Sequence, residues 1–261
     1  MTANKKRKTV GVALGGGAAR GIAHVGVIKA LLEHKIPIDY IAATSAGSVV
    51  ASLYGAGIDI DKIVEIGSNL TWSNFSRFKL SRRSLVSSKP IQELLEKYIG
   101  KKRIKDFKIP ISILVTDILT GKGVKLTDPE LEIGLAVRAS TSFPGIYEPT
   151  EINGVYYFDG GAAFNLPCNV VKEMGADIVI GVDVIPKITI KTLPHNVATL
   201  VDRGLDILLN SISSYLAKEA DIVLYPVTER FTSFNVRRGK RLIELGYEHT
   251  KTHIDEIKSL L

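Results

Sequence analysis

The sequence of 261 residues contains one cysteine, Cys168. A single cysteine cannot form an internal disulfide, so we expect a fold held by packing alone and a reducing compartment, the cytoplasm. Cys168 follows Pro167 and is most simply interpreted as a small buried apolar residue. The sequence also has no uninterrupted apolar run approaching the roughly 20 residues of a spanning helix, which argues against a membrane span.

The N-terminus has only a superficial likeness to a secretory signal. Lys5–Lys8 could be its basic region, and Thr9–Leu14 the start of its apolar core. That core is interrupted by three glycines and then by Arg20, so it is too short and too polar for a signal. We expect residues 1–8 to be a basic, flexible tail and residues 9–261 to form one domain, because no repeat, low-complexity segment or linker divides them.

Basic residues outnumber acidic residues by 34 to 27, which gives a formal net charge of +7. Part of this excess lies in two clusters, Lys5–Lys8 and Lys101–Arg103. Such clusters are usually solvated surface, and the sharper alternative is attraction to anionic lipid or nucleic acid. We expect no nucleic-acid partner and keep open a peripheral contact with an anionic membrane, at its inner face.

The order of apolar and small-residue segments predicts an α/β fold. Two strand candidates, Thr9–Leu14 and Ile38–Thr44, are each followed by a helical pattern, at Ile22–His34 and Ser45–Gly57. A strand–helix–strand unit of this kind is parallel and right-handed, so the loops after both strands lie at the same edge of the sheet, where ligands bind. We expect a single-domain, three-layer α/β/α sandwich with a largely parallel central sheet.

Ser45 stands at the join between the second strand candidate and its helix, within Thr44-Ser45-Ala46-Gly47. A serine on a sharp strand-to-helix turn projects its hydroxyl off the end of the sheet, with backbone amides nearby. A nucleophilic serine needs this exposure, this fixed direction and these donors for the oxyanion that it creates. The plain alternative is a structural serine that caps the next helix.

A glycine loop, Gly15-Gly16-Gly17, follows the first strand candidate directly. Glycines let backbone amides approach a ligand closely, and a helix that starts after them adds its positive end. A dinucleotide fingerprint would need a glycine where Arg20 stands, and a P-loop would need Gly-Lys-Ser or Gly-Lys-Thr. What remains is an anion-binding loop able to hold an oxyanion, or a turn chosen only for packing.

Asp159 ends an apolar strand candidate and is followed by Gly160 and Gly161. The preceding hairpin, from Pro149 with Asn153-Gly154 as its turn, would return Asp159 to the sheet edge. A carboxylate within about 3 Å of a serine hydroxyl can take its proton when partial burial raises the carboxyl pKa. An ordinary turn aspartate is the alternative.

Histidine is the usual base of a serine hydrolase, but no histidine here stands in a loop after a late strand, where one would be needed. His24 falls inside the first helix and is interpreted as a packed residue. His249 and His253 lie one helical turn apart, yet no carboxylate or cysteine pattern supports a metal site, so we expect no metal.

The serine turn, the glycine loop and the later Asp-Gly-Gly, in this order, resemble the patatin-like phospholipase family, in particular its small single-domain bacterial members. The resemblance covers about Val10 to Asp183. It implies hydrolysis of lipid acyl esters by a Ser–Asp dyad without histidine or cofactor, by an esterase of the phospholipase A or lysophospholipase type. A lipid or acyl ester would be the substrate, and no oligomeric state is implied.

Carried over to this sequence, the resemblance implies Ser45 as nucleophile and Asp159 as base. The oxyanion hole would be formed by the backbone amides of Gly15, Gly16, Gly17 and Ala46. The supporting positions would be Arg20, Gly21, Gly47, Gly160 and Gly161. Arg20 would brace the glycine loop or meet a phosphate head group.

The family's serine motif usually opens with glycine, and Ala43 occupies that place here. This departure keeps open a non-catalytic lipid-binding or regulatory protein with the same fold. A second alternative is an acyltransferase that passes an acyl group from the serine to a thiol, although enzymes of that kind pair serine with histidine.

The segment Thr71–Arg83 is basic and aromatic. Its Trp72, Phe75 and Phe78 recur every three residues, so a helix would present them on one flank. A segment of this type can lie in a lipid interface, and we take it as a candidate lid. The alternative is a core-facing helix with a solvated basic side. Further along, Val197–Leu216 has the pattern of a long amphipathic helix.

Overall fold

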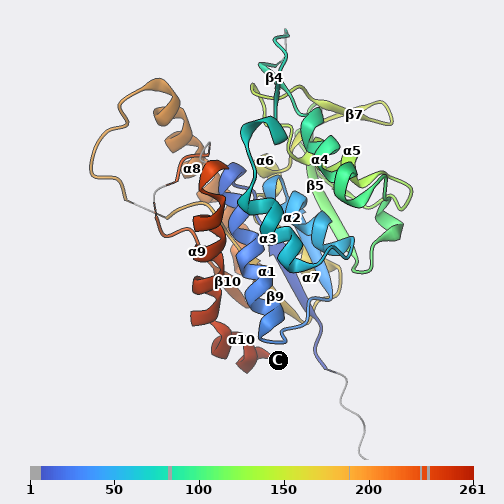
Figure 1. Cartoon of the computed structure of the whole chain (residues 1–261), viewed down its shortest axis with the longest axis vertical. Coiled ribbons are helices and arrows are strands. Elements are labelled where there is room, and N and C mark those ends of the chain that lie inside the picture. The colour runs from blue at the N-terminus through green and yellow to red at the C-terminus, as the bar shows by residue number, and fades with distance from the viewer. Residues whose placement is uncertain (1–6, 82–83, 188, 230, 234–235) are drawn as a thin grey trace, which may run out of the picture.

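The computed structural model describes residues 7–81, 84–187, 189–229, 231–233 and 236–261 (Figure 1). Most of the expected tail, residues 1–6, therefore lies outside the described residues. Arg7 forms an ion pair with Asp39 at 2.6 Å, and the Lys8 ammonium donates to the carbonyl oxygen of Leu260. The last two residues of that segment thus contact the body of the domain.

Within the described residues, one eight-stranded sheet has the order β10-β9-β1-β2-β5-β8-β7, and β6 also pairs with β5. The parallel strands are β1 (Val10–Leu14), β2 (Tyr40–Thr44), β5 (Ile111–Asp117), β9 (Ile178–Val182) and β10 (Ile222–Leu224). The antiparallel additions are β6 (Gly123–Leu126), β7 (Thr150–Ile152) and β8 (Val155–Asp159). β3 (Arg77–Phe78) and β4 (Val86–Ser87) form a separate two-stranded pair.

The register around β5 brings two distant strand ends together. Leu114 of β5 pairs with Thr44, the last residue of β2, and the next residue, Val115, pairs with Asp159, the last residue of β8. Both of these partners lie on the same side of β5, because β6 occupies the other side at Leu114 and at Val115. β2 and β8 run toward each other along that side. Ser45 and Asp159 therefore meet where the two strands end.

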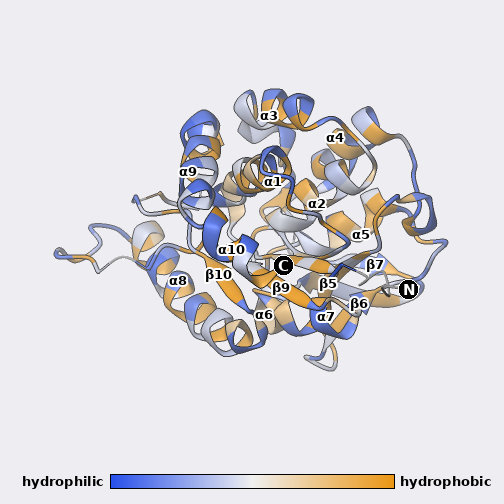
Figure 2. Cartoon of the chain, turned by 90° about the horizontal axis from the view of Figure 1, so that it is seen from below, coloured by the Kyte–Doolittle hydropathy of each residue, from blue (hydrophilic) through white to orange (hydrophobic). Residues whose placement is uncertain are grey.

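Helices cover both faces of the sheet, as Figure 2 shows. One layer contains α1 (Ala23–Glu33), α2 (Ala46–Gly55), α3 (Ile60–Ser68), α4 (Lys89–Ile99), α5 (Ile133–Ser140) and α9 (Gly239–Thr252), which ends beside α10 (Ile254–Leu260). The other contains α6 (Gly161–Phe164), α7 (Cys168–Glu173) and α8 (Val197–Leu216). The strand residues alternate accordingly, with Val12 facing the first core and Ala13 the second. The predicted three-layer α/β/α fold is confirmed.

The segment around Trp72 is not the helix whose flank was considered. It forms a single 3₁₀ turn, η2 (Trp72–Asn74), and then enters the β3–β4 pair. The backbone amide and the hydroxyl of Thr71 both donate to the side-chain oxygen of Asn74. This local arrangement competes with a continuous helix. Phe75 packs against the core, whereas Trp72 and Phe78 are exposed.

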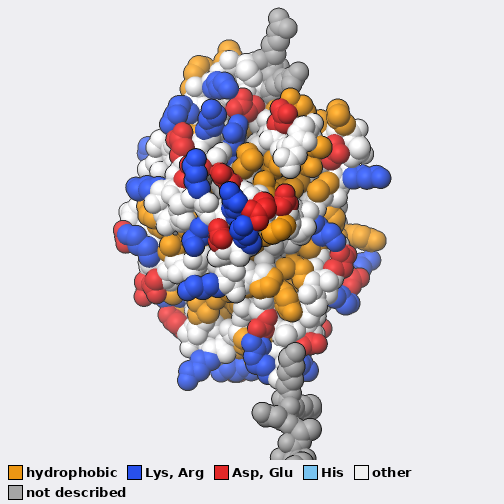
Figure 3. Space-filling view, turned by 90° about the vertical axis from the view of Figure 1, so that its right-hand side faces the viewer, with side chains coloured by type: hydrophobic (Ala, Val, Ile, Leu, Met, Phe, Trp, Pro, Cys, Tyr) orange, Lys and Arg blue, Asp and Glu red, His pale blue; other side chains and the backbone are white. Residues whose placement is uncertain are grey.

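The molecular surface mixes charges of both signs. Figure 3 shows Lys and Arg side chains interspersed with Asp and Glu and with apolar groups on one face of the molecule. Arg103, from one of the basic clusters, forms an ion pair with Glu130, as Arg7 does with Asp39. These two members of the clusters belong to ordinary surface ion pairs. Of the helices in the described ranges, none is both long enough and apolar enough to cross a bilayer.

Candidate active site

Ser45 lies on a strained turn between β2 and α2. Its φ of 49° and ψ of −123° fall in a region that a residue with a side chain rarely adopts, and such backbone costs on the order of 1–3 kcal/mol. The Ser45 hydroxyl donates to Asp159 Oδ2 at 2.6 Å. Ala43, two residues earlier, lies inside β2 with its side chain in the core, and its φ is not positive. An alanine is therefore accommodated there without strain.

Hydrogen bonds through Ser140 and close packing at two glycines hold this turn. The Ser45 amide donates to the hydroxyl of Ser140 at 2.9 Å, and that hydroxyl donates to the Leu114 carbonyl oxygen at 2.6 Å. Gly47 packs so closely on β1 that a Cβ there would lie 2.4 Å from the Leu14 carbonyl oxygen. Gly21 leaves similar room for Ala46, since a Cβ at Gly21 would lie 2.4 Å from that methyl group. The small residues of both motifs thus serve close packing beneath the serine.

Asp159 is buried, and this burial raises its carboxyl pKa from 3.8 to about 6. The hydrogen bonds from Ser45 and from the Gly161 amide, the latter at 2.8 Å to Oδ1, oppose that rise. Tyr147 lies close enough for the charge of Asp159 to contribute, after burial, to raising the tyrosine pKa to about 12. A carboxylate with a pKa near 6 is a stronger base than a solvated one and is still ionised at neutral pH.

The glycine loop uses two of its three backbone amides in hydrogen bonds to distant segments of the chain. The Gly15 amide donates to the Val182 carbonyl and the Gly16 amide to the Asn165 carbonyl, both at 3.0 Å. In the described part of the chain, the amides of Gly17 and Ala46 donate no backbone hydrogen bond of this kind. Of the four amides expected in the oxyanion hole, these two are the ones left to donate. Gly16 instead allows close approach, since a Cβ there would lie 3.3 Å from Ser45 Cβ.

Arg20 is buried beneath the glycine loop. Its Nε donates to the Gly17 carbonyl at 3.2 Å, and its Nη2 to the Ser233 hydroxyl at 2.9 Å. Its guanidinium forms an ion pair with Asp206 of α8 at 2.7 Å. These contacts are those of a brace for the loop, the first of the two roles considered for this residue, and a side chain with 1% exposure has little surface to offer a head group.

The histidines that sequence reasoning weighed have hydrogen-bond partners other than the Ser45 hydroxyl, which donates to Asp159. His24 is fully buried in α1, and its Nε2 lies 2.8 Å from the Gly15 carbonyl oxygen. Burial lowers its pKa to about 4. His249 accepts from the Tyr225 amide through Nε2. Within the described ranges, the structure contains no cluster of three or more His, Cys, Asp or Glu side chains able to hold a metal ion.

Sequence reasoning missed several residues that support the site. Ser140 and Asn165 orient the backbone around Ser45 and Gly16, and Asp206 pairs with the brace Arg20. Ser140 begins the small-residue segment Ser140–Ile146, which resembles a family loop beside the active site but gave Ser140 itself no role. Asn165 is an isolated polar residue between Phe164 and Leu166. Two aspartates inside the amphipathic pattern of α8 gave a signal of the same kind, because a buried polar side chain needs a partner.

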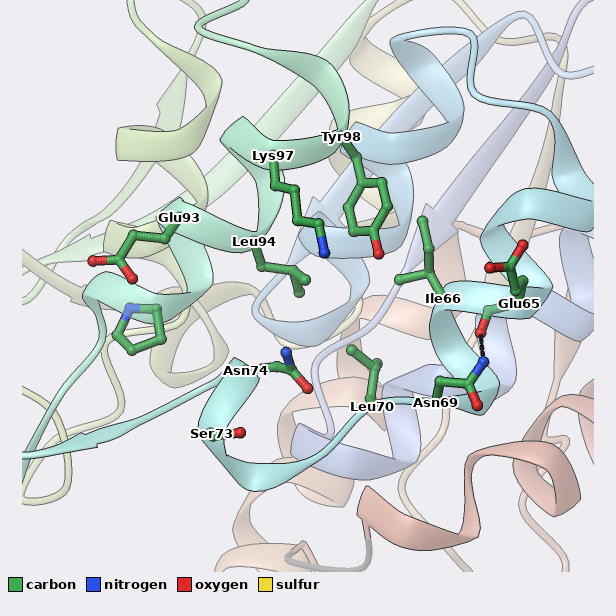
Figure 4. A pocket seen from close by; sticks show the side chains of 11 residues that line it. Glu65, Ile66, Asn69, Leu70, Ser73, Asn74, Glu93, Leu94, Lys97 and Tyr98 are labelled. Carbon is green, nitrogen blue, oxygen red and sulfur yellow. Dashed lines mark hydrogen bonds between the residues drawn. The ribbon is translucent and has the colours of Figure 1, made fainter.

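A pocket of about 260 Å³ lies between α3, η2 and α4, as Figure 4 shows. Leu70, Leu94 and Tyr98 line it together with Glu65, Glu93 and Lys97. Neither Ser45 nor Asp159 is among its lining residues. The pocket is therefore a feature separate from the Ser45–Asp159 pair.

Two relatives are each about one third identical to this chain over about two thirds of its length. An uncharacterized NTE family protein of Mycobacterium tuberculosis is 34% identical over 176 residues, which are 66% of this chain and 48% of the relative. The lysophospholipase NTE1 of Yarrowia lipolytica is 33% identical over 189 residues, 68% of this chain and 13% of the relative. The chain thus spans about half of the first relative and a small part of the second.

Solved structures share the fold at low sequence identity. VipD from Legionella pneumophila matches with a TM-score of 0.62 and 16% identity, covering 98% of this chain and 72% of that one. The type III effector ExoU matches with a TM-score of 0.53 and 13% identity, covering 96% of this chain and 53% of that one. The family model described as patatin-like phospholipase matches residues 12–172, which include the glycine loop, Ser45 and Asp159. The chain belongs to the patatin-like phospholipase family.

Proposed function

We propose that this protein is a serine hydrolase of lipid acyl esters, with Ser45 as nucleophile and Asp159 as its base. The observation that carries the proposal is the 2.6 Å hydrogen bond from the hydroxyl of Ser45, on a strained turn, to a buried carboxylate. Nucleophile and base are within the reach that proton transfer requires. The partner at the serine is a carboxylate, so nothing in this arrangement favours the Ser–His chemistry of a thiol acyltransferase.

The reaction would proceed in two halves. Ser45 Oγ attacks the ester carbonyl carbon while its proton passes to Asp159. The tetrahedral oxyanion accepts hydrogen bonds from the amides of Gly17 and Ala46, and a carboxylic base, being weak, leaves much of the barrier to these donors. As the carbon–oxygen bond breaks, Asp159 returns the proton to the departing alcohol, which leaves an acyl-serine. Water then gives a proton to Asp159 and attacks the acyl carbon. Asp159 passes this proton to Ser45 Oγ as the bond between Oγ and the acyl carbon breaks, which releases the fatty acid and restores Ser45.

A lipid ester is the substrate class that family membership supports. Relatives carry the name lysophospholipase, but the chain spans only part of their length. We therefore propose for this chain only a class of substrate, the acyl esters of phospholipids or lysophospholipids, and not the particular substrate of any relative. Exposed Trp72 and Phe78 remain candidates for contact with lipid, and we place the protein in the cytoplasm with peripheral access to the inner face of the membrane.

Fatty-acid release from lysophosphatidylcholine in micelles tests this proposal. Wild type should release fatty acid, and Ser45→Ala should lose about 10²-fold or more of the rate. A serine-directed fluorophosphonate should label wild type at Ser45. A wild type that neither hydrolyses the lipid nor takes the label would instead support the non-catalytic alternative that Ala43 left open.

A further inference from the structure

The long helix α8 packs with its polarity reversed. Its three charged residues are Asp202, Arg203 and Asp206, and both aspartates are buried while Arg203 is half-buried. The outward face instead carries six large side chains that are each between 53% and 77% exposed: Val197, Leu200, Val201, Ile207, Leu208 and Tyr215. A helix that faced only water would show the opposite arrangement.

Contacts on the inner face fix this orientation. Asp206 forms the buried ion pair with Arg20, and Asp202 accepts from the Ser233 amide at 3.3 Å. Ser213 accepts from the Asn165 side-chain amide at 2.8 Å. Rotating the apolar face inward would leave buried charges and amides without partners, which costs several kcal/mol. The apolar face must therefore point outward.

The helix also borders the Ser45–Asp159 pair. A Cβ at Gly161, two residues after Asp159, would lie 3.5 Å from Leu209 of α8. Asn165, which bonds to Ser213, also accepts the Gly16 amide of the glycine loop. Figure 1 shows α8 at the periphery of the molecule, and Figure 2 shows it on the sheet face that also carries α6. The helix therefore packs through its inner face on the segments that hold the candidate active site, and its outer face carries the exposed apolar surface.

The exposed charged side chains in the chain just before and just after the helix are basic, and Glu219, the residue after Lys218, forms an ion pair with Lys172. Between residues 186 and 218, the acidic residues are Asp202 and Asp206, both buried. Exposed basic side chains stand before and after the helix, at Lys187, Lys191 and Lys218. Leu193, which is 85% exposed, lies in the chain between the first two of these lysines and the helix. An uncharged apolar band with lysines at its ends is the arrangement with which a helix lies in an anionic lipid interface.

We propose that the outer face of α8, with Leu193, docks onto an anionic lipid surface and so brings the candidate active site to the lipid. The inference deepens the proposed function, on which it rests for the identity of the docked lipid as substrate. A second copy of the chain fits less well, because a two-fold contact through this face would bring the lysines of both copies together. Docking by α8 is distinct from the contact expected of Trp72 and Phe78.

Co-sedimentation with vesicles of phosphatidylcholine and phosphatidylglycerol tests the docking. The variant Leu200→Gln/Leu208→Gln changes two exposed side chains and keeps helix propensity, so the fold should hold. The matched control is Leu119→Gln, an exposed leucine in the turn between β5 and β6. All proteins carry Ser45→Ala during binding, so the vesicles stay intact and docking is read whether or not the protein is a hydrolase.

The protein with the wild-type α8 sequence should bind the vesicles. The double variant should have a vesicle partition coefficient at least tenfold lower, which corresponds to about 1.4 kcal/mol. The control should bind like wild type. With Ser45 restored, the double variant should hydrolyse a soluble short ester at the wild-type rate and vesicle lipid more slowly. Equal binding by the double variant would overturn the proposal. So would a wild-type dimer that the double variant dissociates, if vesicle binding is weak in both.

Discussion

At the scale of single residues, the main feature is a buried carboxyl that must be ionised to act. Because burial raises the Asp159 pKa to about 6, the base form is lost when the pH falls through that value. We predict that kcat/KM for a neutral ester is constant above about pH 7 and falls with unit slope below about pH 6. Initial rates across this range measure it. A rate that stays constant down to about pH 4 would exclude Asp159 as the base.

The same burial also predicts an effect on stability, and this effect is unfavourable to the native state. The Asp159 pKa rises from 3.8 in the unfolded chain to about 6 in the fold, so ionising it destabilises the native state. The penalty is absent below about pH 4, grows between about pH 4 and pH 6, and is then constant at about 3 kcal/mol. Asp159→Asn, which does not titrate, should therefore gain stability over wild type on going from about pH 4 to about pH 8.

Urea unfolding at both pH values measures this difference. Asp117→Asn is the matched control. Asp117 is an aspartate of β5, and although burial is the largest single effect on its pKa and raises it, the hydrogen bonds from Thr120 and Leu119 together outweigh burial and lower the pKa. It should show no such gain. If Asp159→Asn is no more stable than wild type at the higher pH, the carboxyl does not carry the burial penalty assigned to it.

At the scale of elements, the end of α5 holds the turn between β2 and α2. The Ser140 hydroxyl is the acceptor for the Ser45 amide and a donor to Leu114. Ser140→Ala should lower the free energy of unfolding by about 1–2 kcal/mol and kcat by about tenfold, since a buried amide loses its partner and the nucleophile its fixed direction.

The control for this variant is Ser52→Ala. Ser52 is buried in α2, and its hydroxyl has no hydrogen-bond partner among the described residues. Its removal should leave both the stability and kcat nearly unchanged. Chemical denaturation and ester hydrolysis measured on both variants decide the point, and equal effects from the two serines would contradict a special role for Ser140.

The Arg20–Asp206 ion pair joins the glycine loop to α8. Because both partners are buried, Arg20→Gln or Asp206→Asn alone should each destabilise the protein by about 3–5 kcal/mol, and the double variant by less than the sum. The exposed pair of Arg7 and Asp39 offers a control: Arg7→Gln should leave the free energy of unfolding nearly unchanged. Additive effects in the double-mutant cycle would show that the two buried side chains do not interact in solution.

At the scale of the whole molecule, the sheet topology creates the site. Chain order makes β1 and β2 parallel neighbours, and their following loops share one edge of the sheet. The antiparallel β8 then enters that edge beside β5 and stops where β2 stops. The sequence pattern predicted this approach from the hairpin turn at Asn153-Gly154, and the structure has both residues at positive φ in that turn. Two strand ends meeting on one neighbour explain how residues 114 positions apart share a hydrogen bond.

Other features of the site depend on contacts between residues far apart in the chain, which no local sequence pattern encodes. The Gly15 and Gly16 amides are taken by Val182 and Asn165, both far along the chain, so the glycines alone could not reveal which amides stay free. The limits of α8 follow from its periodicity, as predicted. Periodicity identifies two faces but not which one points inward, and here the buried partners Arg20 and Asn165 decide it. The Trp72 segment failed as a helix because hairpin pairing and one core contact outweighed its three-residue spacing.

The most direct test of the Ser45–Asp159 dyad is hydrolysis of p-nitrophenyl butyrate by wild type, Ser45→Ala and Asp159→Asn, measured together at neutral pH. Wild type should turn over the ester, and each variant should lose about 10²–10⁴-fold in kcat while remaining folded. Because the two groups act as a unit, the double variant should lose little more than either single one. Full activity in Asp159→Asn would contradict the account and mean that another group takes the serine proton.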